Sequence, residues 1–306
     1  MRYNNSINIE SLDFRASNSP NELINLSERN YIQQINYTAD KIAKKNVKFL
    51  FLAGPSASSK TTTANKICNQ LIKDGKHATV ISLDDFYLNR CDLPVLPSGE
   101  LDFESIDTLD LPKLYSCLEE LVVKGESDFP IFSFKVGKRL SEVNRITMED
   151  NTTLIIEGLH SLNPVITKNL DSSSFYKVYI SPTCDYFYKN ENVLSAIDVR
   201  LIRRIVRDYF HRNSSINNTL DMWKNVVASE TLNVKPFKDY ADFFIDSTMI
   251  YEPLIFKKYL LELIEKSDDI SEENLGKINS LKCSMDKFNE LDIKYLPHDT
   301  VLREFL

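Results

Sequence analysis

The stretch Phe51-Leu-Ala-Gly-Pro-Ser-Ala-Ser-Ser-Lys60-Thr61-Thr62 decides how the rest of the chain is interpreted. It continues an apolar run that begins at Val47, breaks at Gly54-Pro55, and passes through small residues into an amphipathic segment. A buried strand, a small-residue loop, a Lys-Thr pair and a helix together form a phosphate-binding P-loop. Small residues let consecutive backbone N–H groups turn toward phosphate oxygens, and the positive end of the following helix points to the same place.

One position departs from the P-loop pattern. The pattern has glycine directly before the lysine, and here that residue is Ser59. Glycine is favoured there because the backbone approaches the phosphate closely and adopts special dihedral angles. The serine is compatible with a tolerated change, with weakened nucleotide binding, or with a chain that has lost catalysis. For the loop taken alone, the alternative to a nucleotide site is an ordinary serine-rich turn.

The composition is typical of a soluble globular protein. The 306 residues suit one large domain, or one domain with appendages. The hydrophobic content of 42% and the charged content of 26% are both ordinary. No apolar run approaches the roughly 20 residues that span a bilayer, and the first residues lack the apolar core of a secretory signal. We therefore expect no membrane partner.

Cysteine usage and net charge restrict the function further. The five cysteines are far apart and include no Cys-x-x-Cys pair, which favours reduced thiols, a cytoplasmic location and no structural zinc. The net charge of -7 argues against a nucleic-acid partner, because proteins that bind nucleic acids are usually basic. An anionic ligand must therefore be held by a local cationic site.

The segments around the P-loop predict a βαβ unit. After the loop, a helical stripe consists of Ala64, Ile67, Cys68, Leu71 and Ile72, and Gly75 ends it. A second strand is predicted at about 78–83 and is followed by Asp84-Asp85. Ligands of open parallel sheets bind at the carboxyl ends of strands, so this acidic pair is a candidate for the site. Its structural alternative is a helix N-cap.

The rest of the chain predicts a three-layer α/β fold with a mainly parallel sheet. A strand at about 153–158 again has a carboxylate, Glu157, near its end. The other expected elements are a loose or packed-on arm at 1–26, helices at 26–45 and 109–124, an ordered loop at 88–108, an extended segment at 129–134 with a cationic turn at 135–139, strands at 176–180 and 242–246, and a helical tail. We predict an N-terminal arm and helix (1–45), a P-loop domain (46–265) and a C-terminal helical extension (266–306).

A cationic helix lies between two of the predicted strands. The sequence Asp198-Val-Arg200-Leu-Ile-Arg203-Arg204-Ile-Val-Arg207-Asp208 places its four arginines within about one third of a helical wheel. The simple interpretation is a solvated face paired with nearby carboxylates. Beside a P-loop, arginines are also suited to clamp phosphate and to neutralise a transferring phosphoryl group. We predict a mobile lid at about 190–235.

These motifs together resemble the uridine kinase/phosphoribulokinase family of P-loop kinases. The resemblance covers about residues 45–265 and runs through four motifs in order: 54–62, 82–87, 155–163 and 200–208. A closer resemblance is to a bacterial uridine-kinase-like subgroup, through 102–105, 134–139, 219–223 and 302–305. Within 226–230, Val-Val-Ala-Ser-Glu departs from the subgroup, which usually has a basic pair and a glycine before the glutamate.

The resemblance implies roles for individual residues. It implies a nucleotide donor, ATP or GTP, held with Mg²⁺. Lys60 would hold the outer phosphates, Thr61 with Glu157 would organise the metal, and Asp84 would be the general base. The loop residues expected at the nucleotide are Gly54, Ser56, Ala57, Ser58, Ser59, Lys60, Thr61 and Thr62. Arg200, Arg204 and Arg207 would be lid residues, with Arg204 and Arg207 catalytic and Arg200 at the nucleotide; Arg203 is a fourth candidate.

Acceptor recognition is less similar to the family. Uridine kinases recognise the pyrimidine through a tyrosine and a histidine, and the aligned positions here are Phe132 and Gly137, which offer no equivalent hydrogen bonds. Glu104 matches a family residue at the ribose, and Arg139 matches an arginine near the substrate. Tyr87 lines the pocket or packs in the core. Lys135 and Lys138 suit a phosphorylated sugar.

The sequence thus predicts a kinase that phosphorylates a hydroxyl of a nucleoside, uridine- or cytidine-like, or of a related sugar. One alternative is a non-catalytic nucleotide-binding protein, based on Ser59 and the altered segment 226–230. Another is a kinase for a phosphorylated sugar, as in phosphoribulokinase. The expected partners are a nucleotide donor and a small-molecule acceptor, and the sequence leaves a homo-oligomer open.

Overall fold

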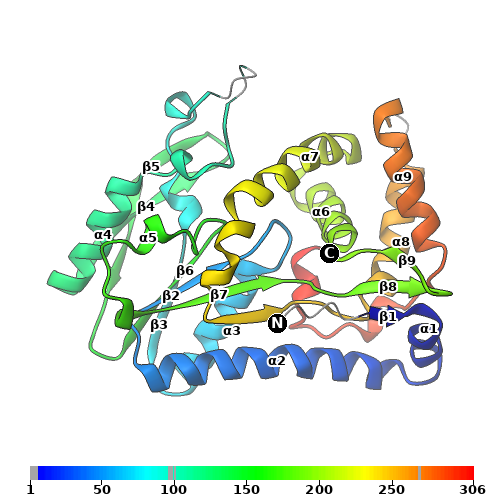
Figure 1. Ribbon diagram of the computed structural model, residues 1–306, viewed down its shortest axis with the longest axis horizontal. Coiled ribbons are helices and arrows are strands. Elements are labelled where there is room, and N and C mark those ends of the chain that lie inside the picture. Colours follow the sequence, from blue (N-terminus) through cyan, green and yellow to red (C-terminus); the bar gives the residue numbers. More distant parts are fainter. Residues whose placement is uncertain (1–5, 96–98, 100, 268–269) are drawn as a thin grey trace.

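Five parallel strands form the central sheet, in the order β10-β7-β2-β6-β3 (Figure 1). The computed structural model describes residues 6–95, 99, 101–267 and 270–306. The strands are β2 (Phe49–Ala53), β3 (His77–Ser82), β6 (Thr152–Glu157), β7 (Phe175–Ser181) and β10 (Phe243–Asp246). The predicted mainly parallel sheet is confirmed, and so is the position of each of its strands to within a few residues.

The central strands β2 and β6 are buried at every position. Strands covered by helices on both faces have apolar residues throughout and no alternation. Alternate side chains nevertheless enter different cores, because Phe49 and Phe51 pack in one cluster while Leu50 and Leu52 pack in another. The sheet is therefore the middle of three layers.

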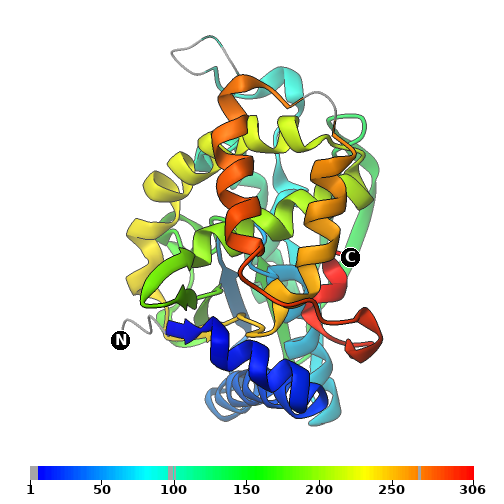
Figure 2. The same ribbon diagram turned by 90° about the vertical axis from the view of Figure 1, so that its right-hand side faces the viewer.

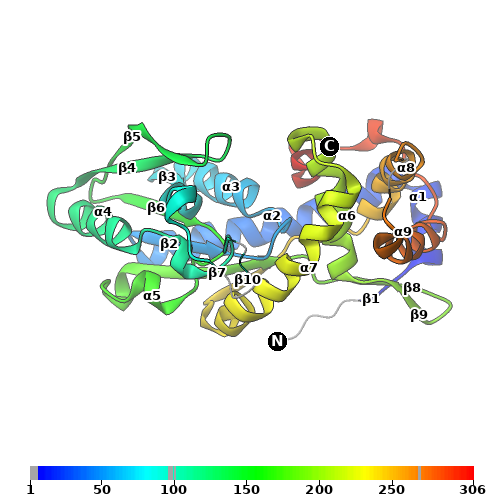
Figure 3. The same cartoon turned by 90° about the horizontal axis from the view of Figure 1, so that it is seen from above.

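Helices α2 (Pro20–Lys45) and α3 (Lys60–Lys73) cover one face of the sheet, and α4 (Leu111–Lys124) and the short α5 (Pro164–Thr167) cover the other (Figures 1 and 3). The predicted stripe of α3 is buried except at its last residue. Ile72 is 52% exposed, which corrects the prediction, because Leu71 takes the inward position at that level of the helix.

An antiparallel hairpin lies beside α4 and consists of β4 (Glu126–Ser133) and β5 (Lys138–Thr147). The sequence indicated only the first strand, followed by a cationic turn at 135–139. In the structure the turn is shorter, and Lys138 and Arg139 already belong to β5. β5 escaped detection because nearly all of its side chains are exposed or half-buried, and an apolar alternation is absent.

The N-terminal arm is helical and packs onto the apolar core through Ile9, Leu12 and Ala16, so the packed-on alternative expected for 1–26 is confirmed for the residues that are described. Strand β1 (Ser6–Asn8) pairs with β8 (Asp185–Tyr188), which pairs with β9 (Glu191–Leu194). Helix α1 (Ile9–Asn18) begins at the Asn8 side chain, which accepts the Ser11 N–H. Residues 1–5 lie outside the described part.

Four helices form the other end of the molecule, α6 (Ala196–Arg212), α7 (Ile216–Asn233), α8 (Glu252–Glu265) and α9 (Glu272–Met285) (Figures 2 and 3). Helix α6 begins with a capping box between Ser195 and Asp198. The helical tail is thus confirmed over its described residues. One apolar cluster joins Leu12, Leu50, Ile205 and Phe305, so the ends of the chain share the core of the central domain. The boundaries near 45 and 265 stay predictions.

The glycine that begins the P-loop sits too close to β7 for any side chain. A Cβ atom on Gly54 would lie 2.2 Å from the Ile180 carbonyl oxygen and 2.7 Å from the Ser58 hydroxyl oxygen. We therefore expect Gly54→Ala to lower the free energy of unfolding by about 3 kcal/mol, as an overpacked core site does. Denaturant titration measures this.

The chain offers a matched control for that substitution. Gly276 lies inside α9, and a Cβ atom there would meet nothing within 4 Å. Gly276→Ala should raise the unfolding free energy by up to about 1 kcal/mol, because alanine favours the helix. A Gly54→Ala protein as stable as the wild type would show that the loop has room that the structure does not contain.

Candidate active site

The P-loop runs from Gly54 to Ser59, between the carboxyl end of β2 and the start of α3. Two of its residues other than glycine have left-handed backbones, Ala57 with φ 59° and Ser59 with φ 70°. Ser59 thus adopts the conformation that glycine takes without strain, and each such residue costs roughly 1–3 kcal/mol. The serine that departs from the motif keeps a glycine-like backbone.

The loop contains buried groups suited to an anion. Ser58 and Ser59 are each 1% exposed, and their hydroxyl oxygens have no hydrogen-bond partner among the described residues. The Lys60 ammonium donates to the Pro55 carbonyl at 3.2 Å, so it folds back along the loop. Buried polar groups are normally satisfied, and these hydroxyls beside a lysine at a helix N-terminus fit a phosphate.

Three carboxyl ends of parallel strands bring the predicted chemistry together. Lys60 follows β2, Glu157 ends β6, and Asp84 follows β3. Burial raises the pKa of both carboxyl groups above the ordinary range, and the Lys60 charge acts on each of them in the opposite direction. The lysine and the two acids therefore lie within electrostatic reach of one another at the carboxyl edge of the sheet, and the space between Lys60, Asp84 and Glu157 is called the crevice below.

Thr61 and Glu157 form a pair of oxygen donors at the start of α3. The threonine hydroxyl donates to Glu157 Oε1 at 3.0 Å, and Glu157 is 5% exposed. A carboxylate so buried is costly unless a cation meets it. Hydroxyl and carboxylate oxygens are the ligands that Mg²⁺ prefers, and this ion commonly uses one or two protein oxygens together with substrate phosphates. The donor set fits a Mg²⁺–nucleotide.

The two adjacent aspartates have different surroundings. The Asp85 carboxylate accepts the Phe132 N–H at 3.1 Å and so anchors the hairpin. Both aspartates lie in a short 3₁₀ turn, Leu83–Phe86. Its N-cap is Ser82, whose hydroxyl accepts the Asp84 N–H at 3.2 Å. The Asp84 side chain is exposed to solvent, although protein surrounds it closely enough to raise its pKa, and the charge of Asp85 adds to this. Asp84 is therefore the one that faces the crevice.

Glu104 lies near the same crevice. Burial, with help from the charges of Glu230 and Asp84, raises its pKa to about 7, against the opposing charges of Arg204 and Lys60. Its loop is fixed by Asp102, whose carboxylate accepts the N–H groups of Glu104 and Ser105 at 2.8 and 3.1 Å. A carboxyl group in this setting changes its charge near neutral pH.

This shifted pKa predicts a pH dependence of stability in the ligand-free protein. The group binds its proton more tightly when folded, so the stability that Glu104 contributes is lost as pH rises from about 4.5 to about 7. Glu104→Gln should therefore be more stable than the wild type at pH 8 and nearly equal at pH 5, with the difference growing by about 2 kcal/mol.

Thermal melts at both pH values check this result. Glu119→Gln, at an exposed position of α4 away from the crevice, is the control and should give the same difference from wild type at both pH values. A gain for Glu104→Gln that is equal at pH 5 and pH 8 would contradict the assigned titration.

Aromatic rings form a wall beside Asp84. The rings of Tyr87, Phe132 and Phe134 lie with centroids 5.1–5.9 Å apart. The Tyr87 hydroxyl donates to the Phe103 carbonyl at 3.0 Å, and burial with the nearby acids raises its pKa, so the phenol stays neutral. Phe134, which is 59% exposed, was not among the predicted substrate residues. Tyr87 and Phe132 thus offer ring surface.

Arg139 already has an acidic partner. Its Nη1 atom lies 3.0 Å from an Asp110 carboxylate oxygen, and its backbone N–H donates to Asn89. Asp110 is the N-cap of α4, where it accepts the Lys113 N–H. The predicted substrate-binding arginine therefore ties the hairpin to α4, and contact with a substrate would have to compete with that pair.

Arg200, Arg203 and Arg204 of α6 are buried and Arg207 is half-buried, which corrects the interpretation as a solvated face, while the expected pairing with carboxylates is confirmed. Arg200 donates to both carboxylate oxygens of Glu230 at 2.6 Å, and Arg203 pairs with Glu252 at 2.6 and 3.0 Å. Arg200 and Arg203 are 6% and 0% exposed. The carboxylates come from α7 and α8, so sequence spacing within α6 could not indicate them. The mobile lid stays a prediction.

In the C-terminal half of α6, three arginines form ion pairs with the same carboxylate. Arg204, Arg207 and Arg212 all pair with Asp208, at 3.2, 2.8 and 3.5 Å. Arg204 also donates to the Ser56 hydroxyl at 3.0 Å. Arg212, which the sequence analysis missed, is near enough that its charge opposes the rise in the Asp84 pKa. Its position four residues after Asp208, one helical turn farther along, was the available signal.

The single tryptophan packs against these arginines. Trp223 on α7 is 7% exposed, and the guanidinium carbons of Arg200 and Arg204 lie 5.3 and 6.0 Å from its ring centroid. A cation over an indole face is attracted to it. Trp223 is therefore a packing residue between α6 and α7.

The end of the chain also reaches the P-loop helix. The Thr62 hydroxyl donates to Glu304 at 2.5 Å, and the Phe305 ring lies 5.2 Å from the Arg203 guanidinium carbon. The sequence motif 302–305 carried no information about this contact. Thr62, predicted at the nucleotide, thus presents its hydroxyl to a carboxylate, while its backbone N–H remains part of the helix start.

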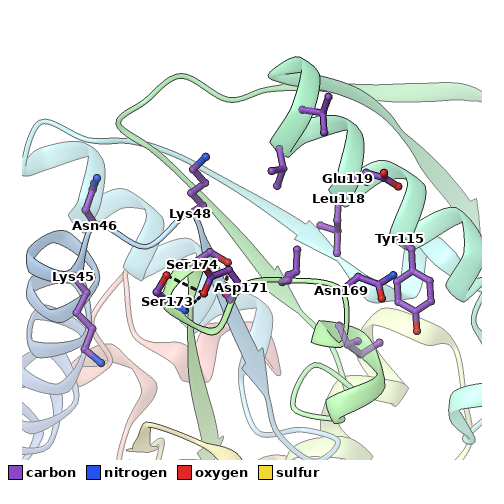
Figure 4. Close-up of a pocket in the computed structure, with 14 residues that line it drawn as sticks. Lys45, Asn46, Lys48, Tyr115, Leu118, Glu119, Asn169, Asp171, Ser173 and Ser174 are labelled. Carbon is purple, nitrogen blue, oxygen red and sulfur yellow. Dashed lines mark hydrogen bonds between the residues drawn. The ribbon is translucent and has the colours of Figure 1, made fainter.

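A separate cavity of about 730 Å³ lies at the opposite edge of the sheet (Figure 4). Lys48 precedes β2, and Ser174 precedes β7, so this cavity is at the amino ends of the strands. Tyr115 and Leu118 of α4 form its other wall. None of the predicted catalytic residues lines it, and it is not part of the candidate active site.

The fold and the geometry of the loop define a P-loop protein with a parallel sheet. A D-glycerate 3-kinase from Cryptococcus neoformans var. grubii has a similar fold, with a TM-score of 0.50 and 17% identity over 68% of this chain and 89% of that one. The chain belongs to the Phosphoribulokinase / Uridine kinase family, whose model matches residues 49–251.

Curated relatives agree with this membership. The chain is 29% identical to a uridine kinase of Brevibacillus brevis over 201 residues, which are 65% of this chain and 85% of that protein. It is 30% identical to a uridine kinase of Schizosaccharomyces pombe over 205 residues, which are 66% of this chain and 40% of that protein. In the described part of the chain, no helix has the length and apolar character to cross a membrane.

Proposed function

We propose that this protein is a kinase that transfers the terminal phosphate of ATP or GTP, as its Mg²⁺ complex, to a hydroxyl group of a nucleoside or a related sugar. The observation that supports this best is the crevice in which Lys60 acts electrostatically on both Asp84 and Glu157. Family membership agrees with a kinase acting on a small-molecule acceptor.

The residues divide into donor and acceptor roles. Lys60 and the N–H groups of the loop would hold the phosphates, and Thr61 with Glu157 would hold the metal. The bound Mg²⁺–nucleotide supplies the phosphoryl group and neutralises its charge, which is most of what this chemistry requires. Asp84 orients the acceptor hydroxyl and takes its proton, and its raised pKa makes it a stronger base than an ordinary aspartate.

The arginines of α6 have a reduced role in this proposal. Arg204 and Arg207 remain the candidates for charge neutralisation, together with Arg212, because all three surround Asp208 near the crevice. Arg200 is held by Glu230 and acts on the loop. Phosphate would have to draw Arg204 or Arg207 away from Asp208 for direct contact.

A nucleoside fits the acceptor side better than a phosphorylated sugar. Tyr87, Phe132 and Phe134 form a cluster of rings against which a flat base could pack, and Glu104 would contact the sugar hydroxyls. Of the cations suited to a sugar phosphate, Arg139 is paired with Asp110, Lys135 is exposed on the hairpin turn, and Lys138 is exposed at the start of β5. These rings offer a base no hydrogen-bonding groups, so we expect the enzyme to discriminate weakly between different bases.

One assay tests the proposal and its alternatives. Purified protein is incubated with Mg²⁺-ATP or Mg²⁺-GTP and a panel of nucleosides, sugars and sugar phosphates, and phosphorylated products are identified by mass spectrometry. A nucleoside monophosphate as the main product supports the proposal. A product only from sugar phosphates would move the acceptor to the phosphoribulokinase type, and nucleotide binding without any product would favour the non-catalytic alternative.

A further inference from the structure

Residue Ser56 of the P-loop is held through all three of its polar groups. Its N–H donates to Glu230 Oε1 at 2.8 Å, its carbonyl accepts from Arg200 Nε at 2.9 Å, and its hydroxyl accepts from Arg204 Nη1 at 3.0 Å. These partners come from α6 and α7, far along the chain. The loop is therefore fixed from outside at the residue before its first left-handed position.

Glu230 is the centre of this arrangement. Its carboxylate takes the loop N–H and both short bonds from Arg200, and Arg200 in turn donates to the loop carbonyl. Glu230 is 2% exposed and Arg200 is 6% exposed. Both Glu230 oxygens accept from the same nitrogen, Arg200 Nη2, and breaking the buried pair is costly because each partner left alone would be an uncompensated buried charge.

The loop needs such support because of its own sequence. Ala57 and Ser59 both have left-handed backbones, a conformation that residues with side chains adopt only when the surroundings enforce it. Glycine at the position of Ser59 would reach the same conformation without strain. The residues that hold Ser56 lie directly beside these two strained positions.

We propose that Glu230 is a positioning residue, which with Arg200 holds the strained P-loop in the shape that binds phosphate. In P-loops with glycine at the position of Ser59, the glycine adopts the left-handed backbone without strain. Here the ion pair stabilises that same backbone conformation for a serine. This inference rests on the proposed function only in that the loop binds a nucleotide. Glu230 acts through Ser56 and makes no contact with the phosphates itself.

Helix α7 extends the same effect toward the acceptor side. The Ser229 hydroxyl and the Asn233 side-chain amide each lie 3.5 Å from the Glu104 carbonyl oxygen, one on each side of Glu230 along the helix. The last turns of α7 thus contact both the P-loop and the Glu104 loop. A change at Glu230 should be felt first at the P-loop, which it touches directly.

A matched control exists on the same helix. Arg203 and Glu252 form a second buried ion pair, here with two separate nitrogens, Nε and Nη2, each donating to one carboxylate oxygen, and both residues are 0% exposed. The Glu252 carboxylate accepts the Met249 N–H and takes no N–H of the loop, while its partner Arg203 donates to the Ala57 carbonyl of the loop at 3.3 Å. Glu252→Gln therefore removes a buried negative charge beside α6 but keeps Arg203 as the donor to Ala57 and leaves the Glu230 carboxylate on the Ser56 N–H.

The experiment compares wild type, Glu230→Gln, Glu252→Gln, Ser59→Gly and the double variant Ser59→Gly/Glu230→Gln. Two measurements are made: Mg²⁺-ATP affinity by calorimetry, and amide hydrogen exchange of residues 54–60 in the ligand-free protein. We expect Glu230→Gln to weaken binding by about tenfold and to speed exchange of the loop, because the strained positions lose their support. Glu252→Gln should lower the melting temperature but keep the affinity within about threefold of wild type.

The Ser59→Gly background distinguishes positioning from general damage. There, Glu230→Gln should weaken binding by less than threefold, because a glycine loop needs less support. If Glu230→Gln does not fold, Glu230→Asp, which keeps the charge but withdraws it from the loop, replaces it, with the same expected direction.

The outcomes separate this inference from the proposed function. Unchanged or tighter ATP binding in Glu230→Gln would overturn it, and tighter binding would show that the carboxylate occupies a phosphate position. An equal loss in both backgrounds would also overturn it. If the wild type binds no nucleotide, the proposed function fails, while the exchange rates of the loop still decide whether Glu230 holds it.

Discussion

Asp84→Asn should lower kcat by about a thousandfold or more while leaving the affinity for Mg²⁺-ATP within a few-fold of wild type. The amide has nearly the same shape as the carboxyl group but cannot take a proton from the acceptor. Asp84 is exposed at the mouth of the crevice, so the fold does not depend on it. Removing a negative charge near Lys60 also gives no reason for weaker nucleotide binding. Steady-state kinetics with the best acceptor, and calorimetry with the nucleotide, provide both numbers.

Asp85→Asn is the control for this substitution, since it changes the neighbouring residue in the same way. Its carboxylate only accepts the Phe132 N–H, and an asparagine carbonyl can accept that bond equally well. We expect a loss of kcat smaller than tenfold. If Asp84→Asn retained a tenth of the wild-type kcat, or if both variants lost activity equally, another group would have to be the base.

Lys60→Ala should reduce kcat/KM by about a thousandfold or more, and should also weaken nucleotide binding. The ammonium group is half-buried and donates only to a loop carbonyl among the described residues, so phosphate oxygens can replace that partner. Its charge also opposes the rise in the pKa of Asp84, Glu157 and Glu104. Without it, the three acids should bind protons more readily. The acidic limb of the activity profile should therefore move to higher pH in any residual activity.

Lys66→Ala is the matched control on the same helix. Lys66 lies farther along α3, where its ammonium donates to the Asp299 carbonyl at the C-terminal segment. Its removal should cost stability at most and leave kcat/KM within a few-fold. A Lys60→Ala enzyme that kept its nucleotide affinity and most of its turnover would remove the central cation from the proposed mechanism.

The local parts of the site could be predicted from sequence because each has a local cause. The strand before the P-loop is apolar at every position, the loop consists of small residues, and the helix after it has a regular stripe. Asp84 and Glu157 were found because parallel strands place their carboxyl ends at one edge. The register of β6 with β2 and β3 then brings these acids beside Lys60.

The remote partners could not be predicted, because no local pattern encodes them. Glu230 and Glu252 neutralise arginines that are 30 and 49 residues away in sequence, so the four arginines were interpreted as an exposed or phosphate-binding face. The contact between Glu304 and Thr62 spans 242 residues. Strand β5 was missed for the opposite reason, since its side chains are too polar to show a sheet period. In each case the information lies in the packing of distant elements.

The placement of Trp223 gives the protein a built-in optical reporter. The indole is the only one in the chain, and it lies on α7 against the α6 arginines that reach the P-loop. Any rearrangement of α6 against α7 changes the electric field at the ring and therefore the colour and yield of its emission. Nucleotide titrations can thus be followed in unlabelled protein, on a stopped-flow timescale, with the signal arising next to the residues that hold the loop.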